Sequence, residues 1–371
     1  MKFIHFGCWN KGKCDLSNPG SQPVSAVIAS IKQYIDKEET KPTFITIAGD
    51  NYYPDYKEGI KIQNYDNFKS GFDCLEKLEN IKKYIIFGNH DYDDIYKTDT
   101  TVIDNPYFEQ KDLSCVNLIS QQKLLDDKSD FKIFNNVLYE YDSDNKTLVI
   151  MIDTNIYVDD PKIYCYKYVF NSGIENVEKK IEHIRQLQLE QVKTIISKNE
   201  SEKIIFIGHQ PIIYCRTRTD NYIKHLDNFI SFFNELEPDI KGKIIKYLCA
   251  DVHFYQRGII TLTNKLEIEQ FIIGSGGTYY CDKVCQLNKL ENNTINNKLL
   301  TYKIIKQEQE YGYLVYDNGN IEFKKVPFHT ASYTIIDSKI IPFNKNFNKD
   351  EKIVCSQIGN ENRRKYKIYY N

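Results

Sequence analysis

The chain has 371 residues, which is enough for one α/β domain of roughly 250 to 300 residues with a tail. Its 49 basic and 51 acidic side chains give a formal net charge of −2, so no excess of positive charge indicates binding to nucleic acid or an anionic membrane. Hydrophobic residues make up 41% of the chain, but no apolar run is long enough to span a bilayer.

The first residues, MKFIHFGCWNK, lead directly into a predicted strand at 2–6 and lack a signal-peptide pattern, so we expect a cytoplasmic protein. His5 lies inside this strand and is assigned to packing. The ten cysteines are scattered without a pairing framework, and we expect reduced thiols. Cys281 and Cys285 are four residues apart, but no second close pair completes a structural zinc site.

The first third of the chain alternates strand and helix patterns. Apolar residues at helical spacing predict a helix at 25–37, and a second strand ends at Asp50. The pattern at 65–81 predicts another helix, which leads to a third strand before Gly88. The polar segment 93–130 is expected to be a long surface excursion near the mouth of a site.

Two hairpins are predicted further along, at 137–155 and at 311–326, because turn residues such as Asn, Asp, Ser and Gly interrupt their apolar runs. A helical pattern between these hairpins extends to Lys198. Two more strands follow it and end just before His209 and shortly before His253.

Four hydrophobic runs end in polar residues that bind metals: FITIAGD, KKYIIFGNH, EKIIFIGHQ and IIKYLCADVH. Such runs suit strands buried on both faces, and ligands at the carboxyl ends of adjacent strands converge on one crevice. The polar residues at these ends are Asp50, Asn89, His90, Asp91, His209, Asp251 and His253. Four such segments in this order indicate a two-metal hydrolase centre.

These segments resemble the calcineurin-like metallophosphoesterases. Asp50-Asn51-Tyr52-Tyr53 resembles the Asp-x-x-Tyr signature of the purple acid phosphatases, the tartrate-resistant acid phosphatase type, within that family. Gly7-Cys8-Trp9 resembles the opening Gly-Asp-Trp, and Ile152-Asp153-Thr154 and the glycine-rich segment 273–277 are further matches. The similarity runs from about residue 1 to about residue 327.

The resemblance implies an α/β fold of the metallophosphoesterase type, a four-layer α/β/β/α sandwich of two mixed sheets flanked by helices. We place this catalytic domain at 1–345. Residues from about 345 onward are polar and charged, so we expect a loosely attached C-terminal tail at 346–371.

The resemblance also implies a binuclear centre, with Fe and a second divalent ion (Mn, Zn, Fe or Mg), that hydrolyses phosphate esters through a metal-bound hydroxide. The ligands of the first metal would be Cys8, Asp50, Tyr53 and His253. The ligands of the second would be Asp50, Asn89, His209 and Asp251. His90, with Asp91 beside it, matches the family's general acid, because an imidazole oriented by a carboxylate donates protons well near neutral pH.

Two of these ligands depart from the family pattern. Cys8 stands where the family has its first metal-binding Asp, and Asp251 replaces the first His of its Gly-His-x-His segment. Both residue types bind metal, but Cys8 also fits an inert buried thiol and Asp251 a solvated carboxylate. Arg216 and Arg218 follow His209 closely and are candidates to contact the substrate phosphate, the alternative being a solvated loop.

The function that this pattern favours is an acid phosphatase-like phosphomonoesterase acting on a phosphorylated small molecule or a phosphoprotein. One alternative is a catalytically weak or inactive homologue that binds phosphate-bearing ligands or a protein partner, and the replacements at Cys8 and Asp251 favour it. Another is a phosphodiesterase acting on nucleotides, which a basic groove would suit better than the net charge of −2. We expect no nucleic-acid partner and no membrane partner.

Overall fold

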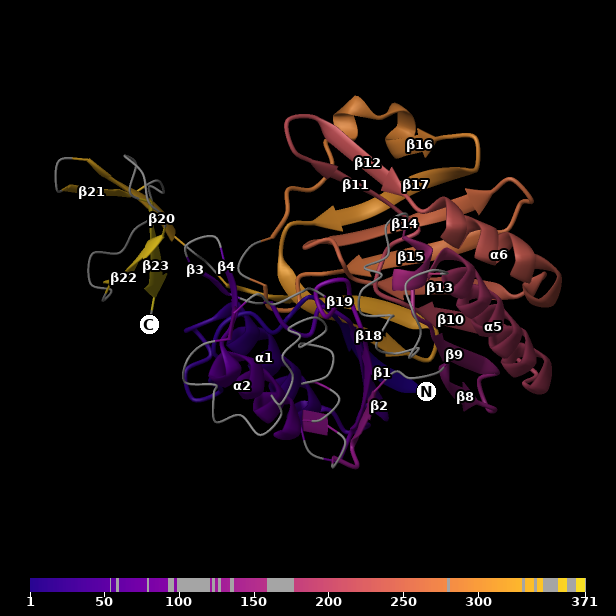
Figure 1. The fold of residues 1–371 in the computed structure, drawn as a ribbon, viewed down its shortest axis with the longest axis horizontal. Helices are drawn as coiled ribbons and strands as arrows, with labels where there is room; N and C mark the ends of the chain where they lie inside the picture. Colours follow the sequence, from indigo (N-terminus) through magenta and orange to yellow (C-terminus); the bar gives the residue numbers. More distant parts are fainter. Residues whose placement is uncertain are drawn as a thin grey trace.

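Figure 1 shows the fold in a computed structural model. The structure describes residues 1–53, 55–57, 60–78, 80–92, 97–98, 121, 124–125, 128–133, 137–158, 177–278, 281–328, 331–336, 339–342, 353–358 and 365–370. Most of the excursion predicted at 93–130 lies outside the described residues.

The first large sheet has six strands in the order β19-β18-β1-β2-β5-β7. Their bounds are β1 Lys2–Phe6, β2 Phe44–Ala48, β5 Lys82–Ile86, β7 Phe131–Ile133, β18 Tyr311–Asp317 and β19 Asn320–Val326. β1, β2, β5 and β7 run parallel, whereas β18 pairs antiparallel with β1 and with β19, so the sheet is mixed. The hairpin predicted at 311–326 is the β18–β19 pair.

The second large sheet has eight strands in the order β16-β17-β14-β15-β13-β10-β9-β8. Their bounds are β8 Leu138–Asp142, β9 Thr147–Met151, β10 Lys203–Ile207, β13 Ile244–Cys249, β14 Tyr255–Leu262, β15 Glu267–Ile273, β16 Thr294–Asn296 and β17 Leu300–Glu308. β9, β10, β13 and β15 are parallel, and the other neighbours pair antiparallel. The hairpin predicted at 137–155 is the β8–β9 pair.

Helices cover the outer face of each sheet, as Figure 1 shows. The α-helices are α1 Pro23–Lys37, α2 Tyr65–Glu76, α5 Val177–Lys198 and α6 Asp227–Ile240, and the 3₁₀ helices are η2 Asn155–Tyr157, η4 Leu287–Lys289 and η5 Glu291–Asn293. α1 begins with Pro23, and its apolar residues Val24, Ile28, Ile31 and Ile35 recur at helical spacing on the buried side. None of the helices in the described residues is long and apolar enough to cross a membrane.

Three hydrophobic clusters separate the four layers. α1 and α2 pack on β1 and β2 through residues such as Val27 and Ile45, and α5 and α6 pack on β10 and β13 through residues such as Val192 and Phe206. Between the sheets, Phe3 and its neighbours meet Ile205 and Leu248. The predicted four-layer α/β/β/α architecture is therefore confirmed.

Smaller sheets complete the chain. They are made of β3 Asp55–Lys57, β4 Ile60–Gln63 and β6 Lys97–Thr98; of β11 Ile213–Thr217 and β12 Asn221–His225; and of β20 Ala331–Ile336, β21 Lys339–Pro342, β22 Ile353–Ile358 and β23 Lys365–Tyr370. In the last of them, strands from both sides of the predicted boundary at residue 345 pair with one another, β23 lying between β20 and β22. The segment expected to be a loose tail thus contains two paired strands.

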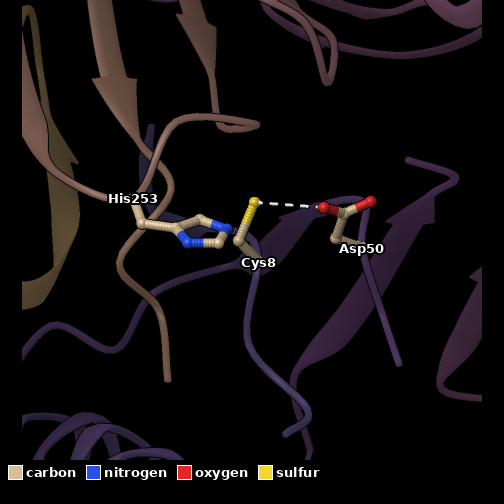
Figure 2. Close-up of side chains that lie close together, drawn as sticks. All are labelled: Cys8, Asp50 and His253. Atoms are coloured by element: carbon tan, nitrogen blue, oxygen red, sulfur yellow. Dashed lines mark hydrogen bonds between the residues drawn. The ribbon is translucent and has the colours of Figure 1, made fainter. Parts of the chain in front are cut away.

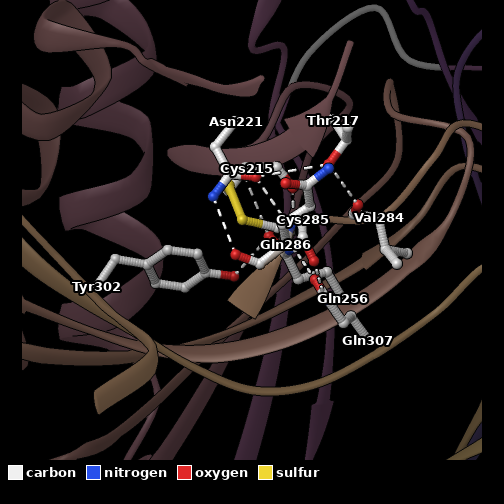
Figure 3. The surroundings of a disulfide bond; sticks show 9 residues. All are labelled: Cys215, Thr217, Asn221, Gln256, Val284, Cys285, Gln286, Tyr302 and Gln307. Carbon is white, nitrogen blue, oxygen red and sulfur yellow. Dashed lines mark hydrogen bonds between the residues drawn. A yellow bond between two sulfur atoms is a disulfide. The ribbon is translucent and has the colours of Figure 1, made fainter. Parts of the chain in front are cut away.

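Among the cysteines that the structure describes, four form disulfides, which corrects the expectation of reduced thiols at these positions. Cys14 is bonded to Cys74, and Cys215 is bonded to Cys285, as Figure 3 shows. Because Cys285 is paired in this way, it cannot form a zinc site with Cys281. Each disulfide joins segments at least 60 residues apart in the chain, so neither pairing leaves a local signal in the sequence.

Candidate metal centre

Five strand ends, three from the first sheet and two from the second, meet at one place. β1, β2 and β5 lead to Cys8, Asp50 and the loop with Asn89, while β10 and β13 lead to His209 and Asp251. Cys8, Asp50 and Asp251 all have left-handed φ angles, of 52°, 50° and 59°. Non-glycine residues adopt this conformation at a cost of about 1–3 kcal/mol, and such strain gathers at functional sites.

The Asp50 carboxylate lies at the middle of the cluster, and its Oδ2 faces one group of side chains. The Tyr53 hydroxyl donates to Oδ2 at 2.8 Å, and Sγ of Cys8 lies 3.6 Å from it. Nε2 of His253 lies 3.2 Å from the Tyr53 hydroxyl. Ligand atoms of Cys8, Asp50 and His253 all lie within 4.8 Å of one another. Figure 2 shows these three side chains lying close together. We name this group site one.

The other oxygen of Asp50, Oδ1, faces a second group. Nε2 of His209 lies 3.3 Å from Oδ1, and the same nitrogen lies 3.0 Å from Oδ1 of Asn89 and 3.6 Å from Oδ1 of Asp251. The backbone N–H of His90 donates to Oδ1 of Asp50 at 2.9 Å. We name the group of Asp50, Asn89, His209 and Asp251 site two.

The donor chemistry of site two fits a cation. Nδ1 of His209 lies 2.6 Å from the carbonyl oxygen of Ala48, so this nitrogen carries the proton and donates it. Nε2 then has a lone pair, and it faces oxygen atoms that also carry lone pairs. A metal ion satisfies such a set, and a hydrogen bond from the other ring nitrogen is the usual way a ligand histidine is oriented. Both groups also suit a metal by residue type, since sulfur, oxygen and nitrogen donors are combined.

The charges of the site support this interpretation. Burial opposes ionisation of Asp50, but hydrogen bonds from the His90 backbone N–H and the Tyr53 hydroxyl favour the carboxylate, and the pKa of Asp50 is lowered to about 2. Burial, reinforced by the Asp50 charge, raises the pKa of Cys8 and of Tyr53 well above their usual values. The thiol and the phenol therefore keep their protons until a cation replaces them.

His90 and Asp91 lie at the site in different ways. The His90 ring is half-buried and packs on the Tyr53 ring, with 4.8 Å between centroids. Asp91 is buried, and its carboxylate accepts hydrogen bonds from Gly88 N, Asn51 N and Nδ2, and Gln121 Nε2. Burial and the nearby Asp50 charge raise the pKa of Asp91 to about 7. Through these contacts Asp91 connects the loops that carry Asn51 and Gly88, and the catalytic role expected of it from the sequence stays a prediction.

Two positioning residues were not predicted. Asn51 accepts from Trp9 Nε1 at 3.1 Å and donates to the carbonyl oxygen of Ile86 at 2.8 Å, so it ties together the loops that follow β1, β2 and β5. Thr154 Oγ1 accepts from the backbone N–H groups of His209 and Gln210, both at 2.9 Å. The only signal for Thr154 was its place in the segment Ile152-Asp153-Thr154, and none pointed to this bond.

The two arginines are placed differently. Nη1 of Arg216 lies 3.1 Å from Oδ2 of Asp282, and this same oxygen accepts from His253 N at 3.2 Å. Arg216 is therefore connected to the metal centre through Asp282, a residue that the sequence analysis missed. Arg218 is exposed and lies over the Tyr222 ring.

The chain belongs to the calcineurin-like phosphoesterases, because the model of that family matches residues 1–255, which include all the ligands of both sites. The resemblance found in the sequence is thus confirmed at the level of the family. The calcineurin-like phosphoesterases are a family of metal-dependent hydrolytic enzymes.

Similar solved structures include purple acid phosphatase PPD1 from yellow lupin, with 14% identity and a TM-score of 0.50 over 92% of this chain and 52% of that one. The chain spans about half the length of the lupin protein. Another is GAP50, the anchor in the inner membrane complex of Plasmodium, with 16% identity and a TM-score of 0.48 over 88% of this chain and 84% of that one. No curated protein matches the chain. The lupin structure supports the fold alone.

Proposed function

We propose that this protein is a metal-dependent phosphomonoesterase of the purple acid phosphatase type, with a binuclear centre. The observation that supports this most is the Asp50 carboxylate, whose two oxygens face two different ligand groups. A carboxylate placed in this way can bridge two cations. When bound, two metal ions neutralise the phosphoryl oxygens and activate the attacking water.

The two sites differ in their ligands, so they favour different ions. Site one offers a thiolate, a phenolate, a carboxylate and an imidazole, which suits iron or zinc. Site two offers two carboxylates, one amide oxygen and one imidazole, which shifts its preference towards Mn²⁺ or Mg²⁺. Cys8 retains the negative charge of the Asp it replaces, and Asp251 adds one, so the centre holds cations tightly while lowering their Lewis acidity.

His90 is the proposed proton donor to the leaving oxygen. Its imidazole is half-buried at the mouth of the site, next to Tyr53, while its backbone N–H holds Asp50 in place. An imidazole can give up a proton near neutral pH, and a positioned general acid contributes typically 10²–10⁴-fold to the rate. The substrate would be a phosphorylated small molecule or a phosphoprotein.

The test combines metal analysis with hydrolysis of 4-nitrophenyl phosphate and of bis(4-nitrophenyl) phosphate. We expect two metal ions per chain and faster cleavage of the monoester. Asp50→Asn removes the bridging charge, so both ions should be lost together with activity. His90→Ala should retain both ions and lower kcat about 100-fold or more.

Several outcomes would contradict the proposal. Preferential cleavage of the diester would support the phosphodiesterase alternative. A chain that binds no metal and cleaves neither ester would support the inactive homologue. Loss of metal on His90→Ala with unchanged turnover would reverse the roles given to His90 and Asp50.

A further inference from the structure

The β11–β12 hairpin carries aromatic and basic side chains on one of its faces. Side chains alternate along a strand, so Tyr214 and Arg216 share a face of β11, and register pairs Arg216 with Tyr222 and Tyr214 with Lys224. Arg218 directly follows this strand. The Arg216 guanidinium lies 5.7 Å from the Tyr214 ring centroid and 5.6 Å from that of Tyr222. Arg218 lies 4.7 Å from the Tyr222 centroid. We name this face the Tyr–Arg face.

The Tyr–Arg face begins next to the metal centre. Arg216 shares the Oδ2 atom of Asp282 with the backbone N–H of His253. The Arg216 end of the Tyr–Arg face therefore adjoins the candidate metal centre.

A disulfide and hydrogen bonds join the hairpin to the segment around Cys285, as Figure 3 shows. The Cys215–Cys285 disulfide fastens its opposite face, and Thr217 donates to the carbonyl oxygens of Lys283 and Val284. Nε of Arg216 is buried and meets no hydrogen-bond acceptor among the described residues. An unsatisfied buried group of this kind costs stability, and it leaves a donor that a polar atom of a ligand can satisfy.

We infer that the Tyr–Arg face binds the base of a nucleoside monophosphate, an inference that rests on the phosphomonoesterase function proposed above. Aromatic rings and guanidinium planes stack on any base. Arg218 and Lys224 give the face positive charge, whereas the charge of Arg216 is balanced by Asp282. Tyr222 is 37% exposed, and its ring centroid lies 6.2 Å from that of the buried Tyr214. The base of a nucleotide is separated from the phosphate by a ribose, so it can reach the exposed ring, whereas an aryl phosphate carries its ring directly on the ester oxygen.

The experiment compares AMP with ribose 5-phosphate, two esters with the same leaving group that differ in the base. We expect kcat/KM for AMP to exceed that for ribose 5-phosphate roughly tenfold, because each stacked base is worth about that factor or more. Tyr222→Leu should bring the ratio towards one. Tyr139→Leu is the matched control, because Tyr139 is 48% exposed on β8, at the edge of the eight-stranded sheet, and this variant should keep the ratio.

Equal kcat/KM values for the two esters, or a ratio that Tyr222→Leu leaves unchanged, would overturn the inference while the phosphatase function stands. If neither ester is cleaved, the proposed function fails, and calorimetric titration with adenosine decides the inference separately. Adenosine binding that is weakened by Tyr222→Leu and not by Tyr139→Leu supports the Tyr–Arg face. No binding, or binding that neither variant changes, overturns it.

Discussion

Cys8, Asp50 and Asp251 each follow a small residue at a strand end and adopt a left-handed backbone conformation. Gly49, before Asp50, also has a positive φ, and a Cβ there would lie 2.7 Å from Nδ1 of His209. The backbone thus turns sharply at this position so that Asp50 and His209 can approach each other. The sequence shows which residues follow the end of each strand. The left-handed backbone conformation that orients their side chains is seen only in the structure.

Tyr53 gives a test at the scale of one residue. If site one holds trivalent iron, the Tyr53 phenolate should produce a visible charge-transfer band, and Tyr53→Phe should abolish or shift it. The phenol lies 2.8 Å from Asp50 Oδ2 and 3.2 Å from His253 Nε2, so it is within reach of an ion held by both. The measurement is the absorption spectrum of the iron-loaded protein before and after the substitution.

Cys8 requires a control in that experiment, because a thiolate bound to iron can also absorb visible light. Cys8→Ser in the same background separates the two contributions. A coloured iron protein whose spectrum is the same with Phe at position 53 would exclude Tyr53 from the ligands.

At the scale of elements, the helices and hairpins could be predicted from the sequence, whereas the disulfide and the ion pair between distant segments could not. The 65–81 pattern predicts α2, and the turn residues at 317–319 predict the β18–β19 hairpin, because periodicity and turn chemistry are local. The Cys215–Cys285 bond and the Asp282 contact with Arg216 join segments more than 60 residues apart. No pattern within either segment identifies its partner.

The Cys215–Cys285 disulfide is expected to stabilise both the fold and the Tyr–Arg face. It closes a loop with a sequence separation of 70 residues, and a loop of that size contributes about 4 kcal/mol to the free energy of unfolding. The double variant Cys215→Ser, Cys285→Ser should therefore unfold at a markedly lower urea concentration and should raise KM for AMP more than it lowers kcat.

Cys281→Ser is the matched control, because Cys281 is a free cysteine four residues from Cys285. It should change the urea midpoint far less than the double variant does. Equal midpoints for the double variant and the wild type, both kept under oxidising conditions, would show that the bond does not form in solution.

At the scale of the whole molecule, the two sheets pack face to face and place their strand ends at one site. The expectation of reduced cysteines rested on the lack of a signal-peptide pattern, and it fails for the described cysteines that form disulfides, since such bonds are typical of oxidising compartments. The core between the sheets is apolar except for a few groups. His5 is one of them, on the same side of β1 as Phe3, with Nδ1 2.9 Å from Thr46 Oγ1.

His5 should make the stability of the whole molecule depend on pH. Burial lowers the pKa of His5 to about 3, so the imidazole is neutral in the folded protein, whereas in the unfolded chain it takes up a proton below about pH 6.5. Since the unfolded state binds more protons in this range, the stabilisation is complete above pH 6.5 and is lost as the pH falls towards 3. The loss of stability approaches about 1.4 kcal/mol per pH unit.

His5→Leu removes this dependence, so its urea midpoint should fall less than that of the wild type between pH 7 and pH 4. His183→Leu, at an exposed position on α5, should retain the wild-type profile. If His5→Leu and the wild type lose stability in parallel as the pH falls, protonation of His5 is not what limits the acid stability of the sandwich.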